Sequence, residues 1–320
     1  MLSRVADHLY WMSRYLERAE HAVRLLSVNL NLMLDESPAS AERRWRRVLA
    51  ALGDPGNVVW SGDPYVLAEE LTFNSADPSS VTSCIVGARE NARNVREQIS
   101  AEQWQWLNQL YLRVARFRID GNADIQLPPF LGSISEGVHL FQGITDSTMS
   151  HGEGWHFIQI GRYLERASAT VKLLEIYYRE FGKPQHSPEG TDFHEWMGLL
   201  RSCTAFEAYC KVYTADLNHD RIMEFLLLSA EFPHSARFSV NHMYGAIEAT
   251  QQEGDRYRGS TLVRIAGKLR ASLGFGQIQE ILAQDACAYL ESVHACCREI
   301  HDTIYRLYID YPVQTALGGA

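Results

Sequence analysis

The hexapeptide RYLERA occurs twice in this chain, at residues 14–19 and again, letter for letter, at residues 162–167. Further landmarks follow each copy in the same order, namely Trp45 and Trp196, Pro78 and Pro233, and Ser80 and Ser235. An identical segment with ordered landmarks behind it is typical of an internal duplication. The sequence therefore predicts two diverged tandem copies of one unit, at residues 1–148 and 149–312, followed by a flexible tail at 313–320.

Each unit is predicted to be helical. From residue 2 to residue 34 there is no Gly or Pro, and apolar residues recur at steps of three and four, which places them on one face of a long amphipathic helix. Helical periodicity returns at 40–52, 79–98, 101–116, 129–144, 153–182, 192–213, 219–229, 235–251, 260–273 and 276–309. No segment has the alternation of a strand, so we expect an all-α fold made of helical bundles.

Composition narrows the class of protein. With 320 residues and a net charge of -9, the chain is large enough for two cores and too acidic for a general nucleic-acid binder. No stretch approaches the ~20 apolar residues of a membrane span, and the charged N-terminus does not resemble a signal peptide. We therefore expect a cytoplasmic protein with no nucleic-acid or membrane partner. Its six cysteines contain no Cys-x-x-Cys pair, which predicts reduced and mostly buried thiols.

The repeated hexapeptide places a charged cluster on one helical face. Helical geometry brings Arg14, Glu17 and Arg18 together, and the second copy repeats them as Arg162, Glu165 and Arg166. Three interpretations are open. The cluster is a solvated ion-pair face, or the glutamates are buried and bond to arginines of a facing helix, or the arginine pairs line a pocket for an anionic ligand between the units. Retention of these polar residues, where neighbouring apolar residues differ, favours the last two interpretations.

A second polar cluster lies in the segment RENARNVRE at 89–97, whose candidate residues are Arg89, Glu90, Asn91, Arg93 and Glu97. On a helix, most of them fall along one side. They form either a solvent face linked by ion pairs, or a second wall of an anion site, or a docking face for an acidic partner.

Motifs for catalysis or metal binding are weak. Helical bundles hold di-metal sites through pairs of Glu-x-x-His motifs combined with two further glutamates, and Glu291 with His294 is one such motif in this chain. There is no phosphate-binding loop, dinucleotide fingerprint or nucleophile elbow. We therefore expect no metal and no cofactor, assign no catalytic residue, and keep a di-metal protein as a minor alternative.

Three segments carry a family resemblance, namely HLYWMSRYLERAEHAVRLL at 8–26, DPSSVTSCIVGARENARNVREQIS at 77–100 and GWHFIQIGRYLERASATVKLL at 154–174. Together they resemble the alpha-E family, named for its helices and its Glu-Arg (ER) motif. The resemblance implies a bacterial protein often encoded beside a circularly permuted ATP-grasp enzyme and a transglutaminase-like protein. It further implies a role in making or modifying peptides, without a defined activity. The motif residues carried over are Glu17, Arg18, Glu165 and Arg166, with Arg89, Glu90, Asn91, Arg93 and Glu97.

Two functions follow as hypotheses. The first is a non-catalytic helical partner of an ATP-grasp ligase, which binds the ligase, a peptide or an anionic small molecule through the Arg/Glu clusters. The alternative is an enzyme of the same pathway. In that enzyme Glu17 or Glu165 would act as general base, while Arg18 or Arg166 orients a carboxylate or acyl phosphate.

Overall fold

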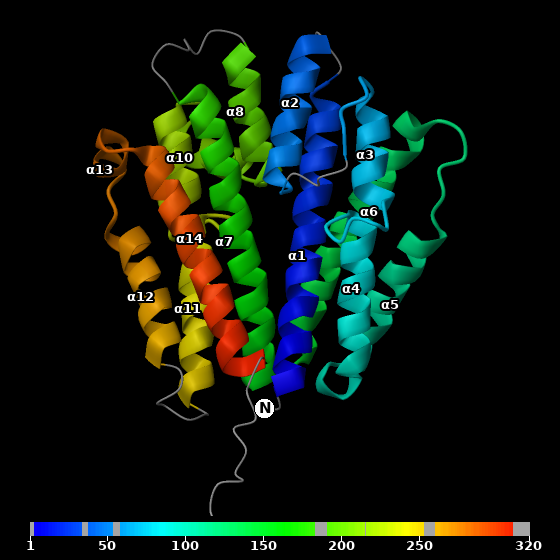
Figure 1. The fold of residues 1–320 in the computed structure, drawn as a ribbon, viewed down its shortest axis with the longest axis vertical. Coiled ribbons are helices and arrows are strands. Elements are labelled where there is room, and N and C mark those ends of the chain that lie inside the picture. Colours follow the sequence, from blue (N-terminus) through cyan, green and yellow to red (C-terminus); the bar gives the residue numbers. More distant parts are fainter. Residues whose placement is uncertain are drawn as a thin grey trace, which may run out of the picture.

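The computed structural model describes residues 3–33, 38–53, 58–182, 191–214, 216–252 and 260–309. In these ranges the chain forms fourteen α-helices and no strand, so the predicted all-α class is confirmed. Figure 1 shows the two longest helices, α1 (Ser3–Asn31) and α7 (Glu153–Phe181), side by side at the centre with one set of helices flanking each. The predicted tail at 313–320 lies outside the described residues.

The first half surrounds α1. Helices α4 and α6 pack directly on α1, and α5 packs on both of them, which makes a four-helix bundle. The shorter α2 and α3 lie near the end at which α1 finishes (Figure 1). The bounds in this half are α2 (Pro38–Ala51), α3 (Pro64–Phe73), α4 (Val81–Asn94), the 3-10 helix η1 (Arg96–Gln98), α5 (Ala101–Arg116) and α6 (Ala123–Thr148).

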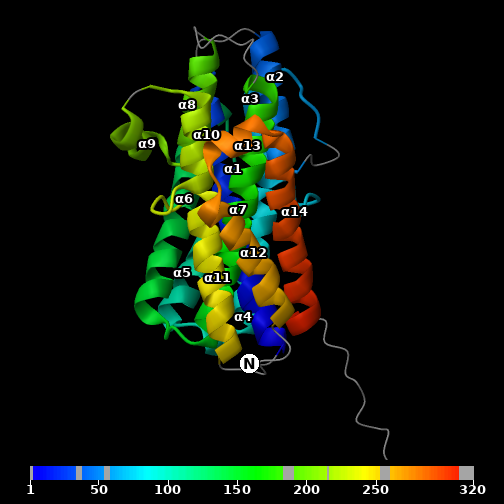
Figure 2. The ribbon, with the colours of Figure 1, turned by 90° about the vertical axis from the view of Figure 1, so that its left-hand side faces the viewer.

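In the second half, other helices pack around α7 as α4, α5 and α6 pack around α1. Helices α11 and α14 pack on α7, and α12 packs on α11 and α14. Figure 2 shows α11 and α12 on this side of the molecule, with α9 standing away from the bundle. The bounds are α8 (Thr191–Ser202), α9 (Phe206–Tyr213), α10 (His219–Leu228), α11 (Ala236–Gln252), α12 (Ser260–Phe275), α13 (Ile278–Ala283), α14 (Ala286–Ile304) and the π-helix η2 (Tyr305–Ile309).

Landmarks of the predicted copies have similar local roles. Ser80 accepts a hydrogen bond from the backbone of Ser83 at the start of α4, and Ser235 accepts one from Phe238 at the start of α11. Trp45 and Trp196 are both buried. An ancient duplication predicts such correspondence, although the duplication and its boundary near residue 148 stay predictions.

Several predicted helices differ from the structure. Helix α3 was not predicted, although Asp63 caps it and Pro64 starts it. The predicted segments 192–213 and 276–309 are each broken into shorter helices, the latter at Asp285, whose side chain caps α14. Helix α6 begins six residues before the predicted 129, because the prolines at 128 and 129 are accommodated inside it.

The two central helices run parallel and touch closely. Leu9 lies beside Gly154, and one to two turns further along Ser13 lies beside Gly161. A Cβ at Gly161 would stand 2.4 Å from the carbonyl oxygen of Tyr10, so only glycine permits this approach. None of the helices in the described ranges is long and apolar enough to cross a bilayer.

Candidate functional site at the interface of α1 and α7

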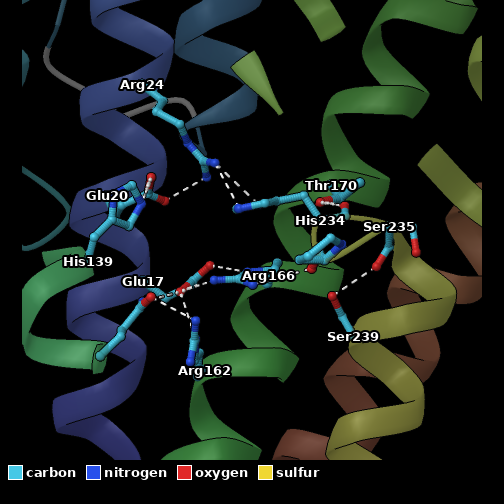
Figure 3. A network of polar contacts seen from close by, with 12 residues as sticks. Glu17, Glu20, Arg24, His139, Arg162, Arg166, Thr170, His234, Ser235 and Ser239 are labelled. Carbon is cyan, nitrogen blue, oxygen red and sulfur yellow. Dashed lines mark hydrogen bonds and ion pairs between the residues drawn. The ribbon is translucent and has the colours of Figure 1, made fainter. Parts of the chain in front are cut away.

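Glu17 of α1 pairs with an arginine of α7. Arg166 donates from Nε to one carboxylate oxygen of Glu17 at 2.5 Å and from Nη2 to the other at 3.0 Å. Gln142 of α6 donates a third bond at 3.2 Å, and Nε of Arg162 lies 3.9 Å away. Figure 3 shows Glu17 held between Arg166 and Arg162. This carboxylate is 1% exposed, so its partners replace water almost entirely.

Glu165 of α7 makes the reciprocal contacts to α1. Arg14 donates to Oε2 of Glu165 at 2.6 Å, and Arg18 donates from Nε to Oε1 at 2.7 Å. Each ER glutamate thus bonds to the arginines of the other copy of the motif. The ion pairs join the two halves of the molecule rather than neighbouring turns of one helix.

Charge and burial oppose each other at Glu165. Burial by itself would raise the pKa of this carboxyl, but the charges and hydrogen bonds of Arg14 and Arg18 outweigh it and lower the pKa to about 2. The carboxyl is therefore ionised at neutral pH. A group with so low a pKa is a weak proton acceptor, since an effective general base titrates near the working pH.

Beyond Arg14 the contacts continue to α14. Nη1 of Arg14 lies 3.0 Å from Nδ1 of His301, and the hydroxyl of Tyr10 lies 2.8 Å from the same nitrogen. Burial, reinforced by the positive charge of Arg14, lowers the pKa of His301. A neutral imidazole that accepts at Nδ1 fits this arrangement, so the charge here comes from the arginines.

Beyond Arg166 the contacts continue to the segment before α11. Arg166 donates a hydrogen bond to the backbone oxygen of Pro233 at 3.3 Å. The hydroxyl of Thr170 donates one to the backbone oxygen of His234 at 3.1 Å. The ring of His234 lies 3.2 Å from Arg24, which also pairs with Glu20 at 2.6 Å (Figure 3). Burial lowers the pKa of His234 well below its ordinary value, and nearby Arg24 adds to the effect.

A further set of ion pairs lies toward the far ends of α1 and α7 and was not predicted. Arg44 of α2 donates to Glu195 of α8 at 2.8 Å, and Arg47 lies 2.5 Å from the other oxygen of Glu195. Arg47 also pairs with Glu180 at 2.8 Å. Arg44 and Glu195 each precede the landmark tryptophan of their copy, at Trp45 and Trp196.

The second predicted cluster lies elsewhere. Arg89 packs over the rings of Trp104 and Tyr111 of α5 and bonds to Glu90, which also pairs with Arg93 at 2.7 Å. In addition, the amide of Asn91 bonds to the ring of His8 at 2.8 Å, which joins α4 to the start of α1. The hydrogen bonds of this cluster join α4 to α5 and to the start of α1, and its role as a second wall of an anion site stays a prediction.

Glu97 departs from the predicted helix. Helix α4 ends at Asn94 because Val95 leaves the helical conformation, and Glu97 lies in η1 with an exposed side chain. The predicted continuous helix at 79–98 is therefore wrong at Glu97, which does not share a helix with Arg89 and Arg93.

In the described ranges, no group of three His, Cys, Asp or Glu side chains is close enough together to hold a metal ion. Glu291 of the Glu-x-x-His motif at 291–294 is exposed and pairs with Arg179 at 2.6 Å. The motif thus contributes to a surface ion pair.

The geometry decides between the interpretations of the ER cluster. Burial of Glu17 and Glu165 and their pairing with arginines of the facing helix are confirmed. The solvated ion-pair face is wrong, because these carboxylates are 1% and 9% exposed. Binding of an anionic ligand by the arginines stays a prediction.

Comparison with known proteins gives a family and distant relatives. An uncharacterized protein of Mycobacterium bovis is 23% identical over 97% of this chain, and uncharacterized proteins of two Mycobacterium tuberculosis strains are 23% and 22% identical over the same share. The chain spans 37% of the length of each of these relatives. No solved structure matches. The model of the Alpha-E family, a predicted alpha-helical domain with a conserved ER motif, matches residues 1–309, and the chain therefore belongs to the Alpha-E family.

Proposed function

We propose that this chain is a non-catalytic helical module of an ATP-grasp-linked system that makes or modifies peptides. It binds the circularly permuted ATP-grasp ligase, a transglutaminase-like protein, or an anionic peptide or small molecule. The arginines beside the ER glutamates provide the contact, and the glutamates hold those arginines in place.

One observation carries this proposal, namely that each ER glutamate has two arginines. Arg14 and Arg18 face Glu165, so the group retains one positive charge after pairing. Within the described residues Arg18 bonds to Glu165 through Nε alone, and its side chain is 29% exposed. Its terminal nitrogens therefore remain available to a carboxylate or phosphate, for which a guanidinium is a planar donor.

The relatives support an accessory role in a second way. They align with this chain over only 37% of their length, so each contains much additional sequence. A module that recurs as one part of longer proteins is expected to act together with another protein part.

The enzyme alternative is less well supported by the geometry. Both oxygens of Glu165 accept hydrogen bonds from arginine, and its pKa is lowered to about 2 by Arg14 and Arg18 against the opposing effect of burial. Both oxygens of Glu17 accept from Arg166. Neither carboxylate offers an oxygen free of arginine hydrogen bonds that could abstract a proton.

The test is capture of a circularly permuted ATP-grasp protein from the same organism by the immobilised native protein. We expect Arg18→Gln to weaken capture about tenfold or more, as loss of a charge-assisted contact does. The matched control is Arg46→Gln, because Arg46 is an exposed helical arginine that pairs with Glu42. The pure chain should show no ATP hydrolysis and no peptide ligation.

Two results would oppose the proposal. Equal capture by the Arg18→Gln variant and the wild type would show that the ligase is not bound through Arg18. ATP turnover by the pure chain that is abolished by Glu17→Gln in a folded protein would favour the enzyme.

A further inference from the structure

A cleft of about 440 Å³ opens between α6, α7 and α11, away from Arg18. Helix α7 contributes Trp155, Gln159 and Tyr163 to its lining, α6 contributes Asp146, and α11 contributes His242. A cleft of this size accommodates a small ligand of a few residues.

Two buried polar atoms of this lining have no hydrogen-bond partner among the residues that the structure describes. Gln159 is 4% exposed, and its Nε2 makes no hydrogen bond within the described part of the chain. The indole Nε1 of Trp155, one turn earlier on α7, is likewise without an acceptor there. Buried donors are normally satisfied, since an unmet one destabilises the protein, so the pair indicates a bound acceptor.

The side-chain chemistry specifies an amide. The carboxamide of Gln159 both donates and accepts, so a ligand amide satisfies it whichever way its oxygen and nitrogen are assigned. The indole of Trp155 only donates, which requires a carbonyl oxygen in the ligand. A run of peptide groups supplies both.

The walls and charges of the cleft agree with this choice. His151 and Trp155 stack with ring centroids 4.1 Å apart, and Tyr163 and His242 stack at 4.9 Å, so flat faces border the cleft. Burial, and then the charge of Arg162, lowers the pKa of His242, which keeps that ring neutral at pH 7. The carboxylate of Asp146 places a negative charge in this lining, and a negative charge favours a ligand amino group over an anion.

We propose that this cleft binds a short peptide with a free amino end, whose backbone amides bond to Gln159 and Trp155 and whose amino group faces Asp146. This site differs from the arginine contact proposed above. The inference stands without the ligase partnership, because the peptide alone suffices to test it.

The experiment is a fluorine NMR titration of the full chain labelled with 5-fluorotryptophan. The seven tryptophans give separate probes, and Trp155→Phe assigns the signal of Trp155. Trialanine amide should shift this signal in a saturable manner. N-acetylated trialanine amide, which lacks the amino charge, should bind several-fold more weakly, and sodium acetate should leave the signal in place.

Two variants locate the binding. Gln159→Leu keeps the approximate size of the side chain and removes the amide, so it should weaken binding about tenfold. Gly245→Phe should abolish binding by filling the cleft, because a Cβ at Gly245 meets no atom within 4 Å. The matched control is Gly132→Phe, at a helical glycine of α6 with similarly open space outside the lining.

A saturable shift that is lost in Gly245→Phe and kept in Gly132→Phe supports the proposal. It is overturned if trialanine amide leaves the Trp155 signal unchanged at millimolar concentration, or if acetate shifts it equally. Capture of the ligase should be the same for Gln159→Leu and the wild type. Failure of the peptide-cleft proposal can therefore be distinguished from failure of the proposed ligase contact.

Discussion

Gly161 of α7 lies directly against Ser13 of α1, and a Cβ at this glycine would stand 2.2 Å from the hydroxyl oxygen of Ser13. The carbonyl oxygen of Tyr10 would be 2.4 Å away and belongs to the helix backbone, which cannot rotate aside. The closeness of the two helices here sets the separation at which the ER ion pairs form one turn further on.

The first prediction concerns this crossing. Gly161→Ala should destabilise the fold by about 1–3 kcal/mol, because the methyl group forces the central helices apart. Gly132→Ala is the matched control, since its site on α6 is open and alanine favours a helix by ~0.5–1 kcal/mol. Urea unfolding followed by circular dichroism measures both. Equal midpoints for the two variants would show that the contact at Gly161 is dispensable.

The second prediction concerns the ER glutamates. Glu17→Ala should lower the free energy of unfolding by about 3–5 kcal/mol, since removal of one partner leaves Arg166 buried and uncompensated. Glu165→Ala should have a similar effect. Glu42→Ala, which breaks the exposed pair with Arg46, should cost less than ~1 kcal/mol. Thermal melts of the three variants separate the outcomes, and a melting temperature for Glu17→Ala within one degree of that of Glu42→Ala would contradict a structural role.

The third prediction concerns acid. Glu165 has a folded pKa of about 2, lowered by Arg14 and Arg18 against burial, and an ordinary value of 4.5. Its contribution is therefore present above pH 4.5 and is lost as pH falls from 4.5 toward 2. Stability should decline steeply in this window, by an amount of order 2–3 kcal/mol from this group. Glu165→Gln should flatten the decline, as measured by chemical unfolding at several pH values.

The fourth prediction concerns a milder acid range. Burial, with the neighbouring Arg24, lowers the pKa of His21 from 6.5 to about 4. The unfolded chain therefore binds more protons between pH 6.5 and 4, and stability should fall as pH falls through that range. His21→Gln should reduce the slope of stability against pH there, while leaving the slope below pH 4 in place. An unchanged slope would mean that His21 does not titrate as its burial requires.

The fifth prediction concerns the thiols. Cys84, Cys203 and Cys297 are buried, and burial raises the pKa of each to about 12. At pH 8 they should resist iodoacetamide, because the thiolate is the reactive form. Intact-mass measurement should show at most three adducts on the native protein, on the partly exposed cysteines, and six after unfolding. Labelling of Cys203 in the folded protein would contradict the buried assignment.

The fold class followed from the sequence because helical periodicity is a local signal. The long helices α1 and α7 were predicted within a few residues for this reason. Helix α3 was missed although Asp63 followed by Pro64 is a recognisable start, since the segment lacks a clear polar face. The break before α14 was missed because Asp285 was not recognised as a cap.

A structural or binding role of the ER residues could be predicted from the sequence, because the same charged residues occur in both copies of the hexapeptide. Their pairing across the two halves was one of three open interpretations, and only three-dimensional structure could select it. Other partners gave no local signal, since Arg44 and Glu195 are 151 residues apart. The cleft likewise depends on Gln159 and His242, which only the packing of α7 on α11 brings together.

The exchange of ion pairs between the copies means that neither half contains the arginine partners of its own ER glutamate. The two halves are in effect complementary fragments joined by a tether between α6 and α7, and residues 1–148 and 149–312 made as separate chains should reassemble. Arg44 and Glu195 favour association of the two different halves over association of two identical halves. Two copies of the first half, associated in the same way, would set Arg44 against Arg44, whereas the mixed pair sets it against Glu195. Under the proposed duplication, Arg44 and Glu195 are opposite charges at corresponding positions. Each half therefore pairs with the other half rather than with a copy of itself, as the two different subunits of an obligate heterodimer do.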